Sequence, residues 1–188
     1  MRYRIPIIFI ILVALIVGVF VYRRESKNTI NSVFKKLPFF SDNKSNGEVS
    51  EASLTYNDQL LPFSFKYPSD FHTSSFTESA DFNGEEIRVI LVQDKSASGF
   101  QIVITPFTSA DTKVTEERIK KEVPDLVISD AESIFVGRDA NGLAFVSGAQ
   151  SAKQREVWFI YNEYLYQISA PLEVDKTVQA VLNSWQFK

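Results

Sequence analysis

The residues Trp158–Ser169, WFIYNEYLYQIS, decide the fold. Aromatic and aliphatic side chains fill both halves of this stretch, which is typical of two paired strands, and Asn162-Glu163 stands between them at the place of a short turn. Because successive side chains of a strand point to opposite faces, the rings should divide between a core side and a second side. If no helix covers the second side, its rings form a surface for a partner, with Tyr164 and Tyr166 as the candidate binding residues. The alternative is that the rings all belong to the core.

Further strands are predicted on the N-terminal side of this hairpin. Phe63, Phe65 and Tyr67 alternate with polar residues up to Pro68, which is the period of a half-buried strand. Runs rich in β-branched and other apolar residues predict more strands at 87–93, 100–107, 133–137 and 143–149. The loop DKSASG should join the first two of these as a hairpin, and Asn141-Gly142 should be the turn before the last.

Two segments have the period of helices. In TEERIKKEV, residues 115–123, acidic residues precede basic ones by four positions, the favourable order for ion pairs on a helix, and Pro124 ends the pattern. Residues 173–185 carry the apolar stripe of an amphipathic helix. The fold class predicted from these elements is α+β, an antiparallel sheet of about six or seven strands with helices packed on it.

An uncharged apolar run, IPIIFIILVALIVGVFVY at residues 5–22, lies before the predicted domain. As a helix it would extend about 27 Å, close to the roughly 30 Å hydrocarbon core of a bilayer. The run is longer than the apolar part of a signal peptide, and no small-residue cleavage site separates it from Arg24. We therefore expect a single-pass transmembrane helix that holds the protein in the cell membrane.

The charges around this anchor leave its orientation open. Arg2 and Arg4 precede the run, whereas Arg23 and Arg24 follow it together with three lysines, so a count of cations alone keeps the following domain in the cytoplasm. N-terminal signal-anchors commonly have the opposite orientation, and we expect an extracytoplasmic domain. The resulting organisation is a membrane anchor at 1–24, a juxtamembrane segment and flexible tether at 25–53, and a monomeric domain at 54–188.

The composition excludes several classes of function. The chain has no Cys and a single His, so disulfides, thiolate zinc sites, cysteine nucleophiles and motifs that need two His are absent. Residues 1–50 carry eight Lys and Arg against three acids, a net charge of +5, which leaves −8 on the remainder. An acidic domain is a poor ligand for phosphates, so we predict no nucleic-acid partner. We also predict no metal and no cofactor.

Three short motifs match functional patterns by letter only. Ser32-x-x-Lys35 and Ser41-x-x-Lys44 have the spacing of a Ser-Lys nucleophile, but a solvated leader or tether does not lower the pKa of a lysine. Gly137–Gly142, GRDANG, lacks the Lys-Ser/Thr of a phosphate-binding loop and is interpreted as a hairpin turn. Asp81–Glu86 is interpreted as a solvated turn, with weak calcium binding as the alternative.

The one imidazole, His72, follows Asp70 closely and is surrounded in sequence by serines. A hydrolase that uses His72 with Asp70 is the enzymatic alternative, and it requires a nucleophile, a base and an acid that converge in a deep pocket. Proximity along the chain does not establish that convergence. We expect instead a polar loop after the strand at 63–67.

The two ends of the domain resemble the PsbP-like family. FSFKYPSDF, residues 63–71, is similar to the opening motif of that family, F-x-F-x-Y-P-x-x-W/F, and VLNSWQF, residues 181–187, is similar to its closing helix and short last strand. The hairpin at 158–169 stands where the family has its central paired strands. The resemblance implies an α-β-α sandwich around an antiparallel sheet, which serves as a binding or assembly module and not as an enzyme. It does not imply photosynthetic function, because no metal-associated residues can be matched.

The expected function is therefore non-catalytic binding by a membrane-anchored module, through an unknown protein partner. A second alternative is a filament subunit of the pilin kind. This chain lacks the Gly-Phe cleavage site and the following Glu that such subunits carry after their leader.

Overall fold

The computed structural model describes residues 52–79, 86–148 and 153–188, which belong to the compact unit from Glu51 to Lys188. The expected anchor, its flanking arginines, the Ser-Lys motifs and residues 81–85 lie outside the described residues. In the part of the chain that is described, no helix has the length and apolarity that a membrane span needs.

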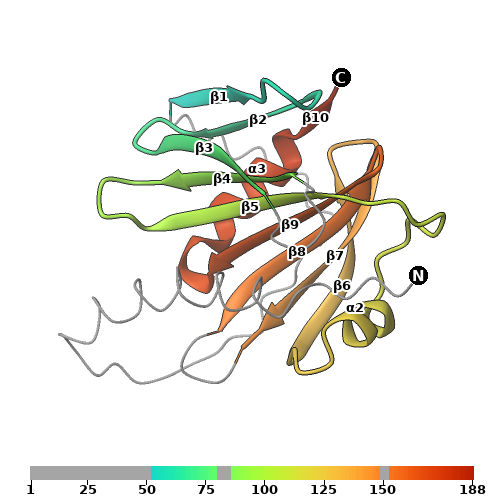
Figure 1. Cartoon of the computed structure of the whole chain (residues 1–188). Coiled ribbons are helices and arrows are strands. Elements are labelled where there is room, and N and C mark those ends of the chain that lie inside the picture. Colours follow the sequence, from blue (N-terminus) through green and yellow to red (C-terminus); the bar gives the residue numbers. More distant parts are fainter. Residues whose placement is uncertain (1–51, 80–85, 149–152) are drawn as a thin grey trace, which may run out of the picture. The chain divides into compact units, whose positions relative to one another are not determined.

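The larger of two sheets has seven antiparallel strands (Figure 1). Their order across the sheet is β3 (His72–Ser79), β4 (Glu86–Gln93), β5 (Gly99–Pro106), β9 (Tyr164–Pro171), β8 (Gln154–Tyr161), β7 (Ala140–Ser147) and β6 (Ile128–Val136). The hairpin β8–β9 lies at the centre of the sheet, and the hairpin β4–β5 lies beside it. The antiparallel strands, together with the α-helices of the described residues, confirm the α+β class.

A second sheet of three strands was not expected. It consists of β1 (Ser53–Asn57), β2 (Phe63–Pro68) and β10 (Gln186–Phe187), in the order β1-β2-β10. The predicted strand at 63–67 is β2, and it pairs with the two ends of the domain instead of joining the large sheet. The ladder starts inside the expected tether, because Ser53 pairs with Pro68 and the Ser69 N–H donates to the Ala52 carbonyl at 3.0 Å.

The helices agree with the predicted segments. Helix α2 (Glu116–Glu122) is capped by Thr115, whose side-chain oxygen accepts from the Arg118 N–H at 3.2 Å. The segment at 173–185 begins as a 3₁₀ turn, η1 (Leu172–Val174), and continues as α3 (Asp175–Ser184). Helix α3 packs on β2 and also touches β6 and β9, with Val178, Val181 and Leu182 buried.

The turn predicted at Asn141-Gly142 is wrong by several residues. The chain turns at 137–139, where Gly137 has φ +57° and donates its N–H to the Leu182 carbonyl at 3.2 Å. Gly142 lies inside β7, where a Cβ atom would stand 2.8 Å from the Trp158 carbonyl oxygen of β8. Gly142 therefore permits close approach of two strands and does not make the turn. The turn at Asn162-Glu163 is confirmed, with φ of 47° and 65° at its two residues.

The segment after β2 is also different from the expected polar loop. A short turn follows β2, in which the Phe71 N–H donates to the Pro68 carbonyl at 3.1 Å. Residues 72–79 then form strand β3 and pair with β4 along their whole length. The sequence HTSSFTES shows no apolar period, because β3 is an edge strand whose side chains are nearly all exposed. Thr and Phe favour strands. The backbone hydrogen bonds come from the neighbouring strand β4, which the polar residues of 72–79 do not by themselves predict.

The core between the two sheets is mainly aromatic. Trp185 stacks on Phe63 and Phe65, with ring centroids 4.8 and 5.1 Å apart, and Phe159 meets Trp185 edge-on at 5.6 Å. Tyr166 is stacked on Phe159 at 4.7 Å. Each buried ring contributes about 1.5–3 kcal/mol by leaving water, so this cluster holds β2, the end of α3 and the β8–β9 hairpin together.

Candidate functional site

Three half-buried rings, Tyr161 and Tyr164 of the β8–β9 hairpin and Phe187 of β10, are termed the hairpin-end aromatics. Tyr161 and Tyr164 are cross-strand partners on either side of the two-residue turn. Tyr161 stacks on Phe187 of β10, with ring centroids 3.7 Å apart and planes 19° apart. The turn itself is held, because the Phe107 N–H donates to the Glu163 carbonyl at 2.7 Å. The aromatic surface is thus fixed by two sheets and by the chain after β5.

The two candidate binding residues have different environments. Tyr166 is 2% exposed and lies in the aromatic core, so its ring is not accessible to a partner. Burial raises the pKa of Tyr166 far above its ordinary value, and the nearby Asp58 carboxylate raises it further. Tyr164 shares the sheet face of Tyr166, but it lies at the sheet margin opposite Pro106 and stays half-exposed. Among these two, only Tyr164 can contact another molecule directly.

The pair His72 and Asp70 does not form an enclosed site. Both residues are exposed, and His72 is the first residue of the edge strand β3, opposite Gln93. The cavity at α2, described below, is lined by other residues. This placement gives no support to a hydrolase that uses His72 with Asp70.

A buried carboxyl group was missed by the sequence reasoning. Glu156, in β8, is 7% exposed and accepts hydrogen bonds from Ser147 Oγ at 2.9 Å and Ser169 Oγ at 2.6 Å. Burial raises its pKa above the ordinary value, although the bonds from Ser169, Ser147 and the Trp158 indole oppose that rise. One signal was available: Glu156 shares a strand face with Trp158 and Ile160, so a carboxylate was placed on an apolar face.

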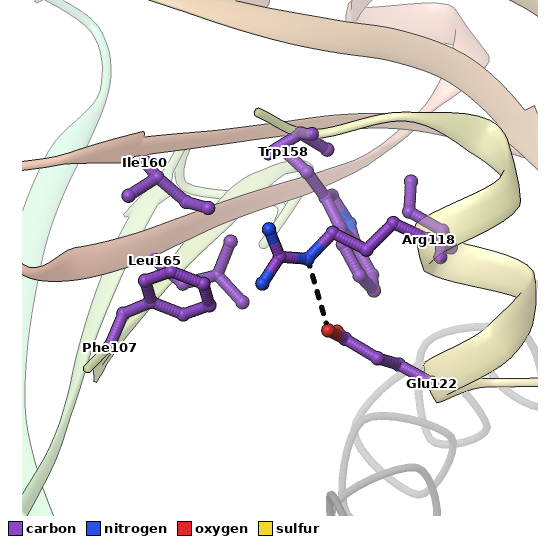
Figure 2. Close-up of a pocket in the computed structure, with 8 residues that line it drawn as sticks. Phe107, Arg118, Glu122, Trp158, Ile160 and Leu165 are labelled. Carbon is purple, nitrogen blue, oxygen red and sulfur yellow. Dashed lines mark hydrogen bonds and ion pairs between the residues drawn. The ribbon is translucent and has the colours of Figure 1, made fainter. Parts of the chain in front are cut away.

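A cavity of about 10 Å³ lies between α2 and the other face of the β8–β9 hairpin (Figure 2). The Arg118 guanidinium points into it, 4.7 Å from the centre of the Phe107 ring, and its Nε donates to Glu122 at 3.1 Å. Arg118 also donates to the carbonyls of Asp111 and Lys113, at 2.6 and 3.2 Å. The volume is at the lower limit for one water molecule. The arginine therefore closes the space beneath α2 and fastens the segment that precedes the helix.

The described residues contain no cluster of three or more side chains that could hold a metal ion. Of the acidic segment Asp81–Glu86, only Glu86 is described, as the exposed first residue of β4. The expectation of a solvated turn there, with weak calcium binding as its alternative, stays a prediction.

The structure defines the class of protein as a sandwich of two antiparallel sheets with α3 packed on the smaller sheet, and with aromatic residues at the junction of β8, β9 and β10. No family model and no curated protein matches the chain. The chain is similar to the solution structure of cyanobacterial PsbP (CyanoP) from Synechocystis sp. PCC 6803. The identity is 16% and the TM-score is 0.47, over 77% of this chain and 98% of that one.

This is the family that the motifs at residues 63–71 and 181–187 resemble. At 16% identity and a TM-score of 0.47, no fold, ligand, partner or activity is carried over from that structure to this chain.

Proposed function

We propose that this protein is a membrane-anchored, non-catalytic module that binds a protein partner through the hairpin-end aromatics. The observation that supports the proposal most strongly is the half-exposed ring of Tyr164 beside the stacked pair Tyr161 and Phe187. Partly exposed aromatic residues on a rigid backbone are frequent energetic anchors of protein interfaces, because they bury much area at small entropic cost.

The non-catalytic part of the proposal is supported by the partners of the buried carboxylates. Asp58 is bound to Arg88, Tyr56 and two backbone N–H groups, and Glu156 is bound to two serines. Both carboxylates thus accept hydrogen bonds from residues of the fold, which is typical of a structural role. The single imidazole, His72, is exposed on an edge strand.

The proposed anchor is the apolar run at 5–22, which has the length of a membrane span. The proposed location of the domain is the outer side of the cell membrane. Protease added to intact spheroplasts should then cut the tether between Ser41 and Ala52 and release the domain. Protection of the chain until the membrane is permeabilised would place the domain in the cytoplasm.

The binding surface is tested by a photoreactive phenylalanine analogue introduced at position 164 of the full chain in its native membrane. The expected result is a cross-linked adduct of defined mass after illumination. The matched control carries the same group at Lys176, an exposed residue of α3. The unlabelled variant Tyr164→Ala should compete less well than the wild-type chain for the same partner. An adduct of equal yield from position 176, or none from position 164, contradicts the proposed surface.

A further inference from the structure

Strands β3 and β6 form the two edges of the large sheet (Figure 1). The two edges differ in their protection. Edge strand β6 contains a bulge between Ser129 and Glu132, where Asp130 has φ 51°. Bulges and charges of this kind keep an edge from pairing with another strand. Edge strand β3 has no bulge, because its eight residues are in regular register with β4, and it has a single charged side chain, Glu78.

Among the described residues, no strand pairs with the outer edge of β3. Seven of its eight residues are exposed, and in the described residues no backbone hydrogen bond joins it to a segment other than β4. Ser75 and Thr77 lie on the face of the sheet that carries Arg88, which donates to Ser75 and to Asp58 after β1, and both residues are exposed. A regular strand with unpaired N–H and C=O groups is a template for another strand.

We propose that the strand that pairs with β3 is β3 of a second copy of this chain, antiparallel, with the two-fold axis at Ser75. A two-fold contact uses the same patch on both copies, so opposite residues must be complementary to each other. In this register His72 of each copy lies opposite Glu78 of the other, a donor opposite an acceptor at both ends. The Phe76 rings, each 37% exposed, become diagonal neighbours across the pair.

Neighbouring registers lack this complementarity. A change of register between the two β3 strands that keeps the sheet faces matched moves the two-fold axis by one residue. An axis at Phe76 places His72 opposite residue 80, beyond the end of β3. In the proposed register the remaining pairs join Thr73 with Thr77, a combination that is favourable across strands. The contact extends the sheet of each copy and is separate from the hairpin-end aromatics.

Cysteine cross-linking tests the register directly, because the chain has no cysteine. The full chain carrying Ser75→Cys is oxidised with copper phenanthroline in the unfractionated lysate of cells that express it. The two introduced thiols would face each other within reach of a disulfide, so a covalent dimer is expected. In the control, Glu78→Cys, the two thiols would lie about 20 Å apart along the strands, so no covalent dimer is expected.

Two further variants keep the test independent of any one substitution. Chains with Thr73→Cys and chains with Thr77→Cys, expressed together, should cross-link to each other and much less to themselves. Phe76→Lys added to Ser75→Cys brings two cations together across the pair and should abolish the dimer. Tyr164→Ala should leave the dimer unchanged, which separates this contact from the proposed partner surface. Monomer in both the Ser75→Cys and the mixed experiment, or equal dimer from Glu78→Cys, would overturn the proposal.

Discussion

The Arg88 Nε lies 2.7 Å from Asp58 Oδ2, and this ion pair joins the large sheet to the turn that follows β1. The Asp58 side chain is fully buried, and Arg88 is 12% exposed. Tyr56 donates to the same carboxylate oxygen at 2.7 Å, while the N–H groups of Leu60 and Leu61 donate to the other oxygen at 2.9 Å. The buried charge is therefore compensated by an opposite charge and by hydrogen bonds at both oxygens.

Breaking this pair from one side should cost more than removing both partners. Arg88→Met leaves a buried carboxylate without its counter-charge, and the free energy of unfolding should fall by about 3–5 kcal/mol. The double variant Asp58→Asn/Arg88→Met should recover part of that loss. Urea unfolding of the single and double variants measures the difference. A double variant that is less stable than Arg88→Met would contradict this account.

The same group predicts acid sensitivity. Burial alone would raise the pKa of Asp58, but the bonds from Leu61, Tyr56, Arg88 and Leu60 outweigh it and lower the pKa below the ordinary value. The stabilisation is present above the pKa of the unfolded carboxyl and is lost as the pH falls through the folded value. Asp58→Asn should flatten the decline of stability in that acid range.

Glu156 should produce the opposite dependence. Its folded pKa is raised by burial, so its contribution to stability is greatest below the unfolded pKa and is lost as the pH rises toward the folded value. Glu156→Gln keeps the shape of the side chain but cannot ionise, so the free energy of unfolding should depend less on pH above 4.5. Urea unfolding at a series of pH values tests this. Parallel pH profiles for the variant and the wild type would show that Glu156 does not titrate differently in the two states.

Gly137 should tolerate no side chain. Its φ is +57°, and an added Cβ would stand 2.5 Å from the Trp185 carbonyl oxygen. Gly137→Ala should lower the free energy of unfolding by more than the roughly 1–2 kcal/mol that the left-handed conformation alone costs a residue with a Cβ. Arg138→Ala, an exposed position in the same turn, should change it by about 0.5 kcal/mol or less. Thermal unfolding of both variants gives the comparison.

Tyr164 and Tyr166 should separate binding from stability. Tyr166→Ala removes a core ring and should cost about 3–5 kcal/mol, as large aromatic deletions do. Tyr164→Ala should cost much less and still weaken partner recovery, because its ring lies at the sheet margin. His72→Ala, an exposed substitution, should affect neither property by more than about 0.5 kcal/mol. Lost cellular activity in a folded, partner-binding His72→Ala chain would favour the hydrolase alternative.

The start of the domain can be tested by truncation. A chain that begins at Glu51 keeps the Ala52 carbonyl that accepts from Ser69 and the Ser53–Pro68 pair, so we expect a soluble fragment with one cooperative unfolding transition. A chain that begins at Leu54 lacks both and should be less stable by on the order of 1 kcal/mol. Aggregation of the longer fragment without detergent would contradict the single-domain organisation.

Local sequence patterns were sufficient for the elements that are rich in buried apolar residues. The hairpin at 158–169 and the helices at 115–123 and 173–185 are close to their predicted bounds, because apolar spacing and the cap at Thr115 are properties of neighbouring residues. Strand β3 was missed for the complementary reason: an edge strand buries little, so its residues need no apolar period.

The sequence by itself determined the α+β class, the hairpins at 87–107 and 158–169 and the lack of cysteine chemistry, since each follows from residue type and short-range spacing. Only the tertiary structure decided that β2 leaves the large sheet to pair with β1 and β10, that Tyr166 is buried while Tyr164 is not, and that Glu156 lies between two serines. These outcomes depend on which distant segments meet. Tyr164 and Tyr166 lie two residues apart on the same strand face. Their exposure differs because Trp185 and Phe63 cover the ring of Tyr166, whereas Tyr164 lies at the margin of the sheet in contact with water.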